Sequence, residues 1–431
     1  MEPFKVDVII FGATGFTGKY IVEECANVGS GQFTWAIAGR NGKKLRELLE
    51  KTSAKTGIDV TNIPTIIANC DDEQSLDEMA KQGHVVINCS GPYRFYGEPV
   101  VRACIQNSVH YVDVCGEPEF MDKMQLLYND AAQANGCYIV SSCGMDSVPV
   151  DLGVVHFMKN FDGQVNYVES YMRFTNNRDT YEPVCNVTTW ESAVHGYSNI
   201  KNLIEIRRQL FSKARKLRPQ PLIPHRPTIH RSELCDNKYS ITFPGADRSV
   251  VVRTQMFLAE QCNLRPVQFN AFMICDSYLI LLAMLIVGYF LQTLTKYSLG
   301  RTLLLKYPEY FSLGMFSRSG PSEEALSSST ATYKFVGEGW SSSYLKNISE
   351  PKTITDPANV TMTTMVNIKN PTYGFTAMCA VLSAVTLLKE PENLPPRGGV
   401  YTPGGAFYDT KFLENMESRG VKFEVIETRQ K

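Results

Sequence analysis

Short apolar runs separated by amphipathic stretches fill the first 150 residues of the chain. Residues 5–11 form a β-rich apolar run, and residues 19–26 follow with apolar positions at helical spacing. Further runs predict strands at residues 33–38, 65–68, 84–89, 111–114 and 138–141. Because strands that alternate with helices form βαβ units, the pattern predicts an α/β fold built on a doubly wound parallel sheet.

The pattern changes near residue 151. We expect strands at residues 165–174, 239–244, 248–255, 331–337 and 360–368, and one long helix at residues 188–217. This mixture predicts a second, α+β domain over residues 151–369 with a mostly antiparallel sheet. After it, residues 373–388 read as an amphipathic helix and residues 421–426 as a final strand.

Residues 278–291 form a run of 14 residues without a charged side chain. A helix that spans a bilayer needs about 20 apolar residues, so a full span is not expected here. Two alternatives remain: a buried or dimer-interface helix, and a one-sided patch that sits on a membrane or a lipid-droplet monolayer. We favour the second, because the run is apolar on all sides and cations and aromatics follow its end.

Charge and cysteine usage narrow the possible partners. The 431 residues carry a formal charge of -1, which argues against a nucleic-acid surface. The 12 cysteines are scattered without a CxxC pair or metal-ligand spacing, so we expect reduced thiols and no metal site. Met1 leads directly into the first strand, so we expect a cytosol-facing protein that is not secreted.

Three glycines spaced three apart, Gly12, Gly15 and Gly18, lie between the first strand and the first helix. The first would permit a tight turn, the second would let a pyrophosphate approach the backbone, and the third would let helix and strand pack closely. The helix N-terminus offers N–H groups to the phosphates. This context predicts a Rossmann-type dinucleotide site over residues 1–150, the alternative being a turn that binds nothing.

The end of the second predicted strand discriminates between cofactors. Arg40 follows that strand, and no acid appears before Glu47. An acid here would accept a hydrogen bond from the ribose of NAD, whereas a guanidinium suits the 2′-phosphate of NADP. We therefore favour NADP(H) over NAD(H).

Loops at the carboxyl ends of parallel strands surround the ligand in such folds, which places Asp71 near the adenine and residues 90–93 near the nicotinamide ribose. The predicted cofactor-binding residues are Gly12, Ala13, Thr14, Gly15, Phe16, Thr17, Gly18, Arg40, Asn41, Asp71, Ser90, Gly91, Pro92 and Tyr93.

A reductase also needs a proton donor. The candidates at predicted strand ends are Tyr93, Tyr96, Asp113, Glu117 and Asp146. Each has a structural alternative, because tyrosines also form pocket walls and acids also cap helices. The sequence therefore assigns no catalytic residue.

Several strings together resemble the saccharopine dehydrogenase family: residues 12–18, 38–40, 88–93, 111–117 and 144–149. Residues 75–80 and 91–99 resemble most closely the saccharopine dehydrogenase-like oxidoreductases of animals. The resemblance covers nearly the whole chain. It implies that residues 151–369 supply a substrate wall and a homodimer contact, and that residues 370–431 return to pack on the nucleotide domain.

The resemblance further implies an NAD(P)-dependent oxidoreductase, an NADPH-using reductase associated with lipid droplets or membranes and acting in lipid or glycolipid metabolism. Saccharopine itself would need clustered cations, and the spacing of Arg173, Arg207, Arg208 and Arg253 does not show that they converge. Together with the apolar run at 278–291, this favours a lipid or another small amphipathic molecule as substrate. The alternative from a different class is a catalytically silent, nucleotide-binding scaffold.

Overall fold

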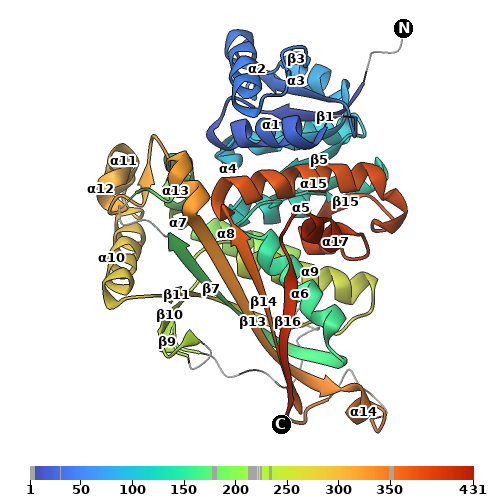
Figure 1. Cartoon of the computed structure of the whole chain (residues 1–431), viewed down its shortest axis with the longest axis vertical. Helices are drawn as coiled ribbons and strands as arrows, with labels where there is room; N and C mark the ends of the chain where they lie inside the picture. Colours follow the sequence, from blue (N-terminus) through green and yellow to red (C-terminus); the bar gives the residue numbers. More distant parts are fainter. Residues whose placement is uncertain are drawn as a thin grey trace.

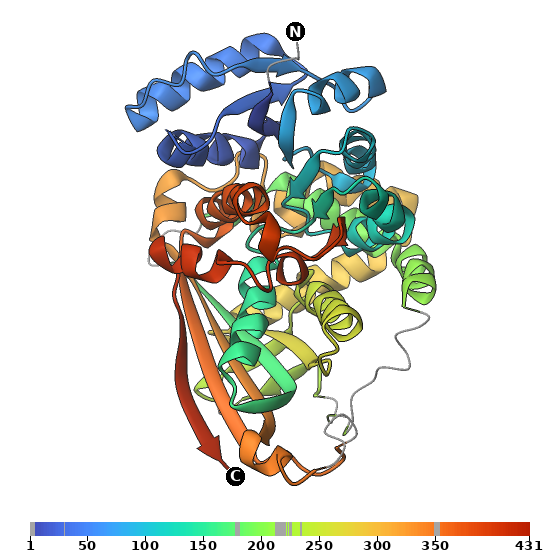
Figure 2. The same ribbon diagram turned by 90° about the vertical axis from the view of Figure 1, so that its right-hand side faces the viewer.

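The computed structural model describes residues 5–29, 31–176, 182–211, 221, 223, 226–232, 235–348 and 354–431. Within them, two seven-stranded sheets lie at opposite ends of the molecule (Figure 1), the N-terminal sheet at the top and the second sheet at the bottom. The same two layers are seen after a quarter turn, with helices between the sheets (Figure 2).

The first sheet is parallel throughout and has the order β15-β6-β5-β4-β1-β2-β3. Its strands are β1 (Val6–Phe11), β2 (Trp35–Gly39), β3 (Thr65–Ile67), β4 (Gly83–Asn88), β5 (His110–Asp113), β6 (Tyr138–Val140) and β15 (Gly399–Tyr401). Strand order 3-2-1-4-5-6 is that of dinucleotide-binding folds, and it confirms the predicted doubly wound sheet.

Helices cover both faces of this sheet, because its central strands are apolar on both sides. They are α1 (Phe16–Gly29), α2 (Gly42–Thr56), α3 (Glu73–Ala80), α4 (Tyr93–Gln106) and α5 (Pro118–Ala134). Residues of α1 and α2 pack with Val8 and Ile10 of β1. Residues of α3, α4 and α5 pack with Ile9 and Phe11 on the opposite face.

The second sheet has the order β16-β14-β13-β7-β11-β10-β9 and is antiparallel except where β7 pairs with β11, as expected for the α+β domain. Its strands are β7 (Gly163–Asn176), β9 (Ile229–Arg231), β10 (Tyr239–Thr242), β11 (Gln268–Cys275), β13 (Ser329–Ser341), β14 (Val360–Lys369) and β16 (Phe423–Gln430). Helices α6 (Val148–Asn160) and α9 (Asp247–Gln261) pack against it. A separate two-stranded sheet pairs β8 (Cys185–Asn186) with β12 (Phe316–Ser317).

Two element predictions in this domain are wrong. Residues 248–255 lie in α9 and not in a strand, because the buried positions of α9 recur at helical spacing and include polar residues that hide the period. The predicted helix 188–217 is divided at Asn199 into α7 (Val187–Ser198) and α8 (Ile200–Leu210), and residues 212–217 lie outside the described residues.

The C-terminal part of the chain contributes a strand to each of the two sheets. A π-helical turn (Pro371–Phe375) leads into α15 (Thr376–Lys389), which packs on α1, β4 and β5. A 3-10 turn (Pro391–Asn393), β15, α16 (Pro403–Ala406) and α17 (Phe412–Ser418) follow, and α17 packs on α15. The last strand, β16, departs from the expected packing on the nucleotide domain, because it pairs with β14 and extends the second sheet. The domain limits themselves stay predictions.

Helix α10 (Tyr278–Leu294) contains the apolar run. Its Val287 and Leu291 pack against Trp190 of α7 and Leu304 of α11 (Ser298–Lys306), while most of its other apolar side chains are exposed. Helices α12 (Pro308–Phe311), α13 (Glu323–Ser328) and α14 (Ser342–Leu345) complete the described helices. Among them, only residues Pro371–Lys389 are long and apolar enough to cross a membrane, and that segment is a mostly buried core helix.

Candidate functional site

The carboxyl ends of β1 and β4 lie side by side at the centre of the first sheet, where the strand order reverses direction, and we call this position the β1/β4 crevice. Such a switch point is where open parallel sheets bind their ligands, since the loops leave the sheet on opposite sides. The loop after β1 carries the three predicted glycines, and the loop after β4 carries Ser90 and Gly91.

The glycine turn is shaped by its surroundings. Gly12 has a φ of 77°, and a Cβ there would lie 2.5 Å from the Ser90 hydroxyl oxygen. A Cβ at Gly18 would lie 2.5 Å from the carbonyl oxygen of Gly12, so only glycine lets α1 approach the turn. Gly15 and Thr14 are exposed at the tip, and the first turn of α1 contains no acid. The turn is therefore an accessible cradle for an anion, and Ala13 beneath it is buried core.

Three predicted residues lie beyond β2 and β3. Arg40 is exposed, and among the described residues its guanidinium has no hydrogen bond or ion pair. The side-chain oxygen of Asn41 accepts from the Lys44 N–H at 3.1 Å, so Asn41 caps α2. Asp71 is exposed next to Cys70. Burial raises the pKa of Cys70 to about 11, with Ser90 and Arg40 close enough to lower it; the ends of β2, β3 and β4 thus meet here.

The loop after β4 is held from below. Asn88 accepts from the Ser90 N–H at 2.9 Å, and the buried Tyr93 donates its hydroxyl to the Asn88 carbonyl oxygen at 2.9 Å. Pro92 is buried as well. Ser90 and Gly91 therefore face the crevice, whereas the Tyr93 hydroxyl is engaged inside the protein.

The second domain closes on this crevice. Thr188 of α7 lies against Gly91, where a Cβ would be 3.6 Å from the Thr188 methyl carbon. The Phe16 ring packs edge-on against Tyr373 at 4.7 Å between centroids. Phe16 thus contacts the C-terminal segment, and it also lies against Gly320 of the second domain. The partly exposed Thr17 follows it in the first turn of α1.

The structure separates the five proton-donor candidates by their partners. Glu117 is buried and accepts from Arg94 Nε at 3.0 Å and from the Tyr93 N–H at 2.8 Å, which makes it a fixed anion under the loop. Asp113 accepts from two backbone N–H groups, and burial raises its pKa to about 6. Tyr96 is an exposed side chain on α4.

Asp146 combines an intermediate exposure with a strongly shifted pKa. Burial raises the pKa of Asp146 to about 7, which keeps much of this carboxyl group protonated at neutral pH. One carboxylate oxygen lies against Gly116, 2.6 Å from where a Cβ would stand, and the other lies against Gly245. A larger residue at either position would displace the carboxyl group.

Asp247, at the start of α9, is a buried acid that the sequence pattern does not single out. Burial raises its pKa well above the ordinary value, and the charges of Asp146 and Asp151 add to the shift. The only local feature of Asp247 is that it is an acid in the first turn of α9. The hydrophobic pattern predicts a strand in place of this helix, so the sequence does not reveal that feature. The fold brings Asp247 near Asp146 from 101 positions away along the chain.

Comparisons with known proteins agree with this geometry. Residues 8–140 match the family model of the saccharopine dehydrogenase NADP binding domain. The chain is 37% identical to a human saccharopine dehydrogenase-like oxidoreductase over 441 residues, covering 100% of this chain and 99% of the relative. It is 37% identical over 433 residues to a Caenorhabditis elegans protein named lipid droplet localized protein, covering 98% of each.

A relative from Arabidopsis thaliana, 33% identical over 97% of this chain and 96% of its own, carries the word mitochondrial in its name. Among solved structures, apo saccharopine dehydrogenase (L-Glu forming) from Saccharomyces cerevisiae shares the fold, with a TM-score of 0.53, 12% identity, and coverage of 99% of this chain and 100% of that one. The chain therefore belongs to the saccharopine dehydrogenase-like oxidoreductases and carries the NADP-binding domain of the saccharopine dehydrogenase family.

Proposed function

We propose that this protein is an NADPH-dependent reductase that works at a lipid surface. The observation that carries the cofactor assignment is the exposed glycine turn at the β1/β4 crevice together with Arg40 at the end of β2, whose guanidinium has no partner within the described ranges. The turn and the N-terminus of α1 would hold the pyrophosphate, and Arg40 would hold the 2′-phosphate. NADPH, when bound, supplies the hydride.

The residue proposed to supply the proton is Asp146. Hydride addition to a C=O, C=N or C=C bond leaves a site that needs one proton, and a carboxyl group with a pKa of about 7 donates it near neutral pH. Of the other candidates, Tyr93 and Glu117 have their polar atoms engaged within the protein, and Tyr96 lies on the outside of α4. Asp113 is fully buried with its Oδ1 accepting from two backbone N–H groups, so it is less accessible to a substrate than Asp146. Asp146 also follows the carboxyl end of β6, on the same edge of the sheet as the glycine turn.

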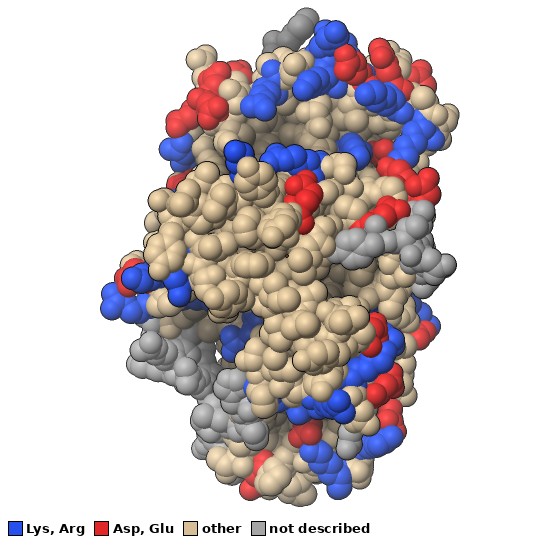
Figure 3. All heavy atoms as spheres, turned by 90° about the vertical axis from the view of Figure 1, so that its left-hand side faces the viewer, with Lys and Arg blue, Asp and Glu red and all other residues tan. Residues whose placement is uncertain are grey.

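The lipid surface is proposed to contact an apolar platform formed by α10, α11 and α12. Its exposed apolar side chains are Tyr278, Leu279, Ile280, Leu282, Leu285, Ile286, Tyr289, Tyr297, Leu299, Tyr307 and Tyr310. Figure 3 faces this side and shows a broad uncharged area with Lys and Arg, and some Asp and Glu, at its margins. Soluble proteins seldom expose an apolar patch of this kind without a partner, and flanking cations suit an anionic interface.

A lipid or other amphipathic substrate suits this location, because the crevice then takes its substrate from the surface on which the protein sits. The name of the worm relative supports the same placement, whereas the name of the plant relative points to another organelle. The cytosolic face of a lipid droplet is the placement that we propose. We also propose a homodimer, on the resemblance of the second domain, which light scattering of the purified protein tests.

The central experiment measures cofactor oxidation by the purified protein on phospholipid-coated droplets loaded with a cellular lipid extract. We expect turnover with NADPH that exceeds turnover with NADH at equal concentration, and its loss in Asp146→Asn. Binding of NADPH without oxidation across extracts from several tissues would instead support a silent scaffold. Equal affinity for the two cofactors would contradict the assignment of Arg40.

A further inference from the structure

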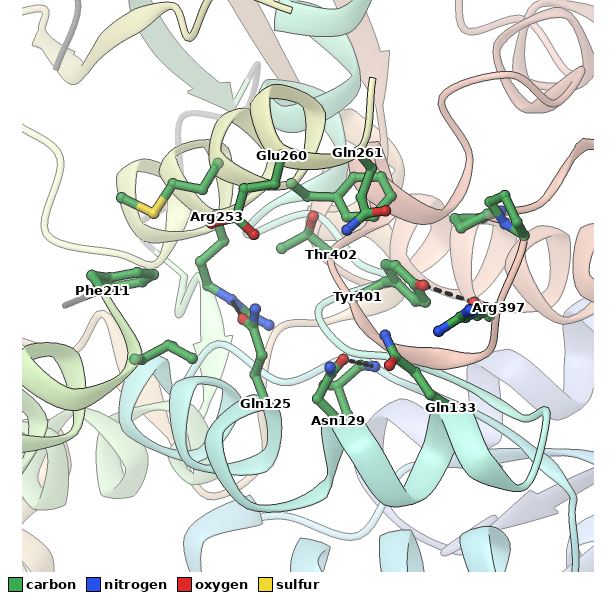
Figure 4. Close-up of a pocket in the computed structure, with 16 residues that line it drawn as sticks. Gln125, Asn129, Gln133, Phe211, Arg253, Glu260, Gln261, Arg397, Tyr401 and Thr402 are labelled. Atoms are coloured by element: carbon green, nitrogen blue, oxygen red, sulfur yellow. Dashed lines mark hydrogen bonds between the residues drawn. The ribbon is translucent and has the colours of Figure 1, made fainter. Parts of the chain in front are cut away.

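A second cavity lies at the edge of the first sheet, away from the glycine turn. It has a volume of about 300 Å³, at the lower end of the range for small-molecule sites. Its walls come from α5, from α9 and from residues 395–402 around β15 (Figure 4). None of its lining residues belongs to the nucleotide site, so a ligand for this cavity does not depend on the proposed function.

A buried guanidinium forms one wall of this cavity. The Arg253 side chain is 2% exposed, and its Nε donates to the Gln125 side-chain oxygen at 2.7 Å. Within the described part of the chain, its Nη1 and Nη2 atoms have no hydrogen-bond partner. Such donors lose their hydrogen bonds to water without a replacement, so a native protein seldom keeps them without a use.

The nearby acid does not satisfy Arg253. Asp122 Oδ1 stands 3.6 Å from Arg253 Nε, and Asp122 Oδ2 accepts from Arg207 Nε at 2.9 Å. Asp122 therefore shares its charge between two arginines. The spacing of Arg207 and Arg253 in the sequence does not show whether they converge, but in the structure both lie beside the Asp122 carboxylate. Arg173 lies elsewhere and pairs with Asp276.

Other donors face the same space. Gln125 and Gln133 lie along one face of α5, and Figure 4 places Arg397 across the cavity from Arg253. No hydrogen bond or ion pair engages the Arg397 guanidinium among the residues that the structure describes. Glu260, the acid of the lining set, lies two turns after Arg253 on α9 and is exposed at the rim.

Apolar groups complete the walls. Phe257 packs edge-on against Tyr401 at 5.1 Å between ring centroids, and Met256 and Phe211 also line the cavity. The cavity thus offers cationic and amide donors for oxygen atoms together with aromatic surface for a short carbon skeleton.

We infer that this cavity is a binding site for a small organic oxyanion, whose carboxylate or phosphate oxygens accept from Arg253 Nη1 and Nη2. A forked guanidinium matches a planar carboxylate or two oxygens of a phosphate. The carbon skeleton of the ligand lies against Phe257 and Tyr401, and its far end lies near Arg397.

The test is calorimetric titration of the full-length protein with glutarate, glycerol 3-phosphate, inorganic phosphate and the neutral isostere glutaramide. We expect glutarate or glycerol 3-phosphate to bind with a Kd below about 1 mM, and glutaramide not to bind. The one of these two ligands that binds more tightly identifies whether the site prefers a carboxylate or a phosphate. Binding of inorganic phosphate alone would show that the walls take no carbon skeleton and would overturn the proposal.

Three variants locate the bound anion. Arg253→Lys keeps the positive charge but removes the forked pair of guanidinium N–H donors. Arg397 is exposed, so Arg397→Gln leaves the core unaltered. Each should weaken binding of the anion about tenfold or more, whereas Glu260→Gln should retain or strengthen it. The affinity for NADPH should stay unchanged in all three. Absence of binding by every anion, or an affinity in Arg253→Lys or Arg397→Gln as high as in the unaltered protein, would overturn the proposal.

Discussion

Gly12 lies so close to Ser90 that a Cβ atom on Gly12 would stand 2.5 Å from the Ser90 hydroxyl oxygen. The turn after β1 and the loop after β4 therefore fix each other. Replacing Gly12 with alanine adds this clash to the cost of a left-handed backbone, about 1–2 kcal/mol. We expect Gly12→Ala to lower the affinity for NADPH at least about tenfold.

Gly57 provides the matched control, because it has a φ of 73° with nothing within 4 Å of its Cβ position. Gly57→Ala should have only the backbone cost, without the clash, and leave the affinity for NADPH intact. Titration by intrinsic fluorescence, with melting curves for both variants, separates the two effects. Equal losses of affinity would mean that the turn does not contact the cofactor.

Arg40 tests cofactor choice. A charge-assisted hydrogen bond contributes about 1.5–3 kcal/mol, so Arg40→Ala should weaken NADPH binding about tenfold to a hundredfold and leave NADH binding nearly unchanged. Lys43→Ala is the control, since Lys43 is an exposed cation in the next turn and lies 3.9 Å from Glu47. A similar loss in both variants would indicate a general field effect and not a specific 2′-phosphate contact.

Asp146 links activity to pH. Folding raises its pKa from 3.8 to about 7, so the folded protein keeps a proton that the unfolded chain loses. The stability therefore falls as pH rises from about 4 to about 7, and the rate of a step that needs the protonated acid falls above pH 7. Asp146→Asn should abolish turnover and flatten the dependence of unfolding free energy on pH.

A substitution at Asp247 tests whether the loss of turnover is specific to Asp146 or also follows from changing a neighbouring acid. Burial and the charges of Asp146 and Asp151 raise the pKa of Asp247 well above the ordinary value, which favours its protonated form. Asp247→Asn should retain turnover and the fall in rate above pH 7. A pH–rate profile that is unchanged in Asp146→Asn would remove Asp146 from the reaction.

The apolar platform is tested by two exposed leucines. Leu279 on α10 is 74% exposed and Leu127 on α5 is 54% exposed. Replacing either leucine with glutamate should change the melting temperature little, because surface substitutions seldom alter stability by more than about 0.5 kcal/mol. Only Leu279→Glu should release the protein from phospholipid-coated droplets in a flotation assay. Retention of both variants would place the lipid contact elsewhere.

A buried ion pair supports the loop after β4. Arg94 and Glu117 are 7% and 3% exposed and lie 3.0 Å apart. Removing Arg94 leaves a buried carboxylate without its cation, so Arg94→Ala should lower the free energy of unfolding by about 3–5 kcal/mol. Arg102→Ala breaks an exposed pair with Glu73 and should cost less than about 1 kcal/mol. Urea denaturation of both variants checks the difference.

The predicted elements are most accurate where the pattern is local. The strands of the first sheet and the turn at residues 12–18 follow from apolar runs and glycine spacing, both of which are properties of a few neighbouring residues. The error at residues 248–255 has the opposite origin. In α9 the buried face includes Asp247, Arg253 and Gln255, whose partners come from other elements, so polarity conceals the helical period.

The sequence by itself determined the parallel sheet, the glycine turn and the cation at the end of β2, because strands, turns and their alternation with helices depend on short-range pattern. Only the tertiary structure decided which acid stays protonated, which face of α10 is exposed, and that Arg253 faces a cavity with Arg397 across it. Burial and hydrogen-bond pairing depend on residues that are distant along the chain. They therefore exist only once the two sheets and the C-terminal segment have packed together.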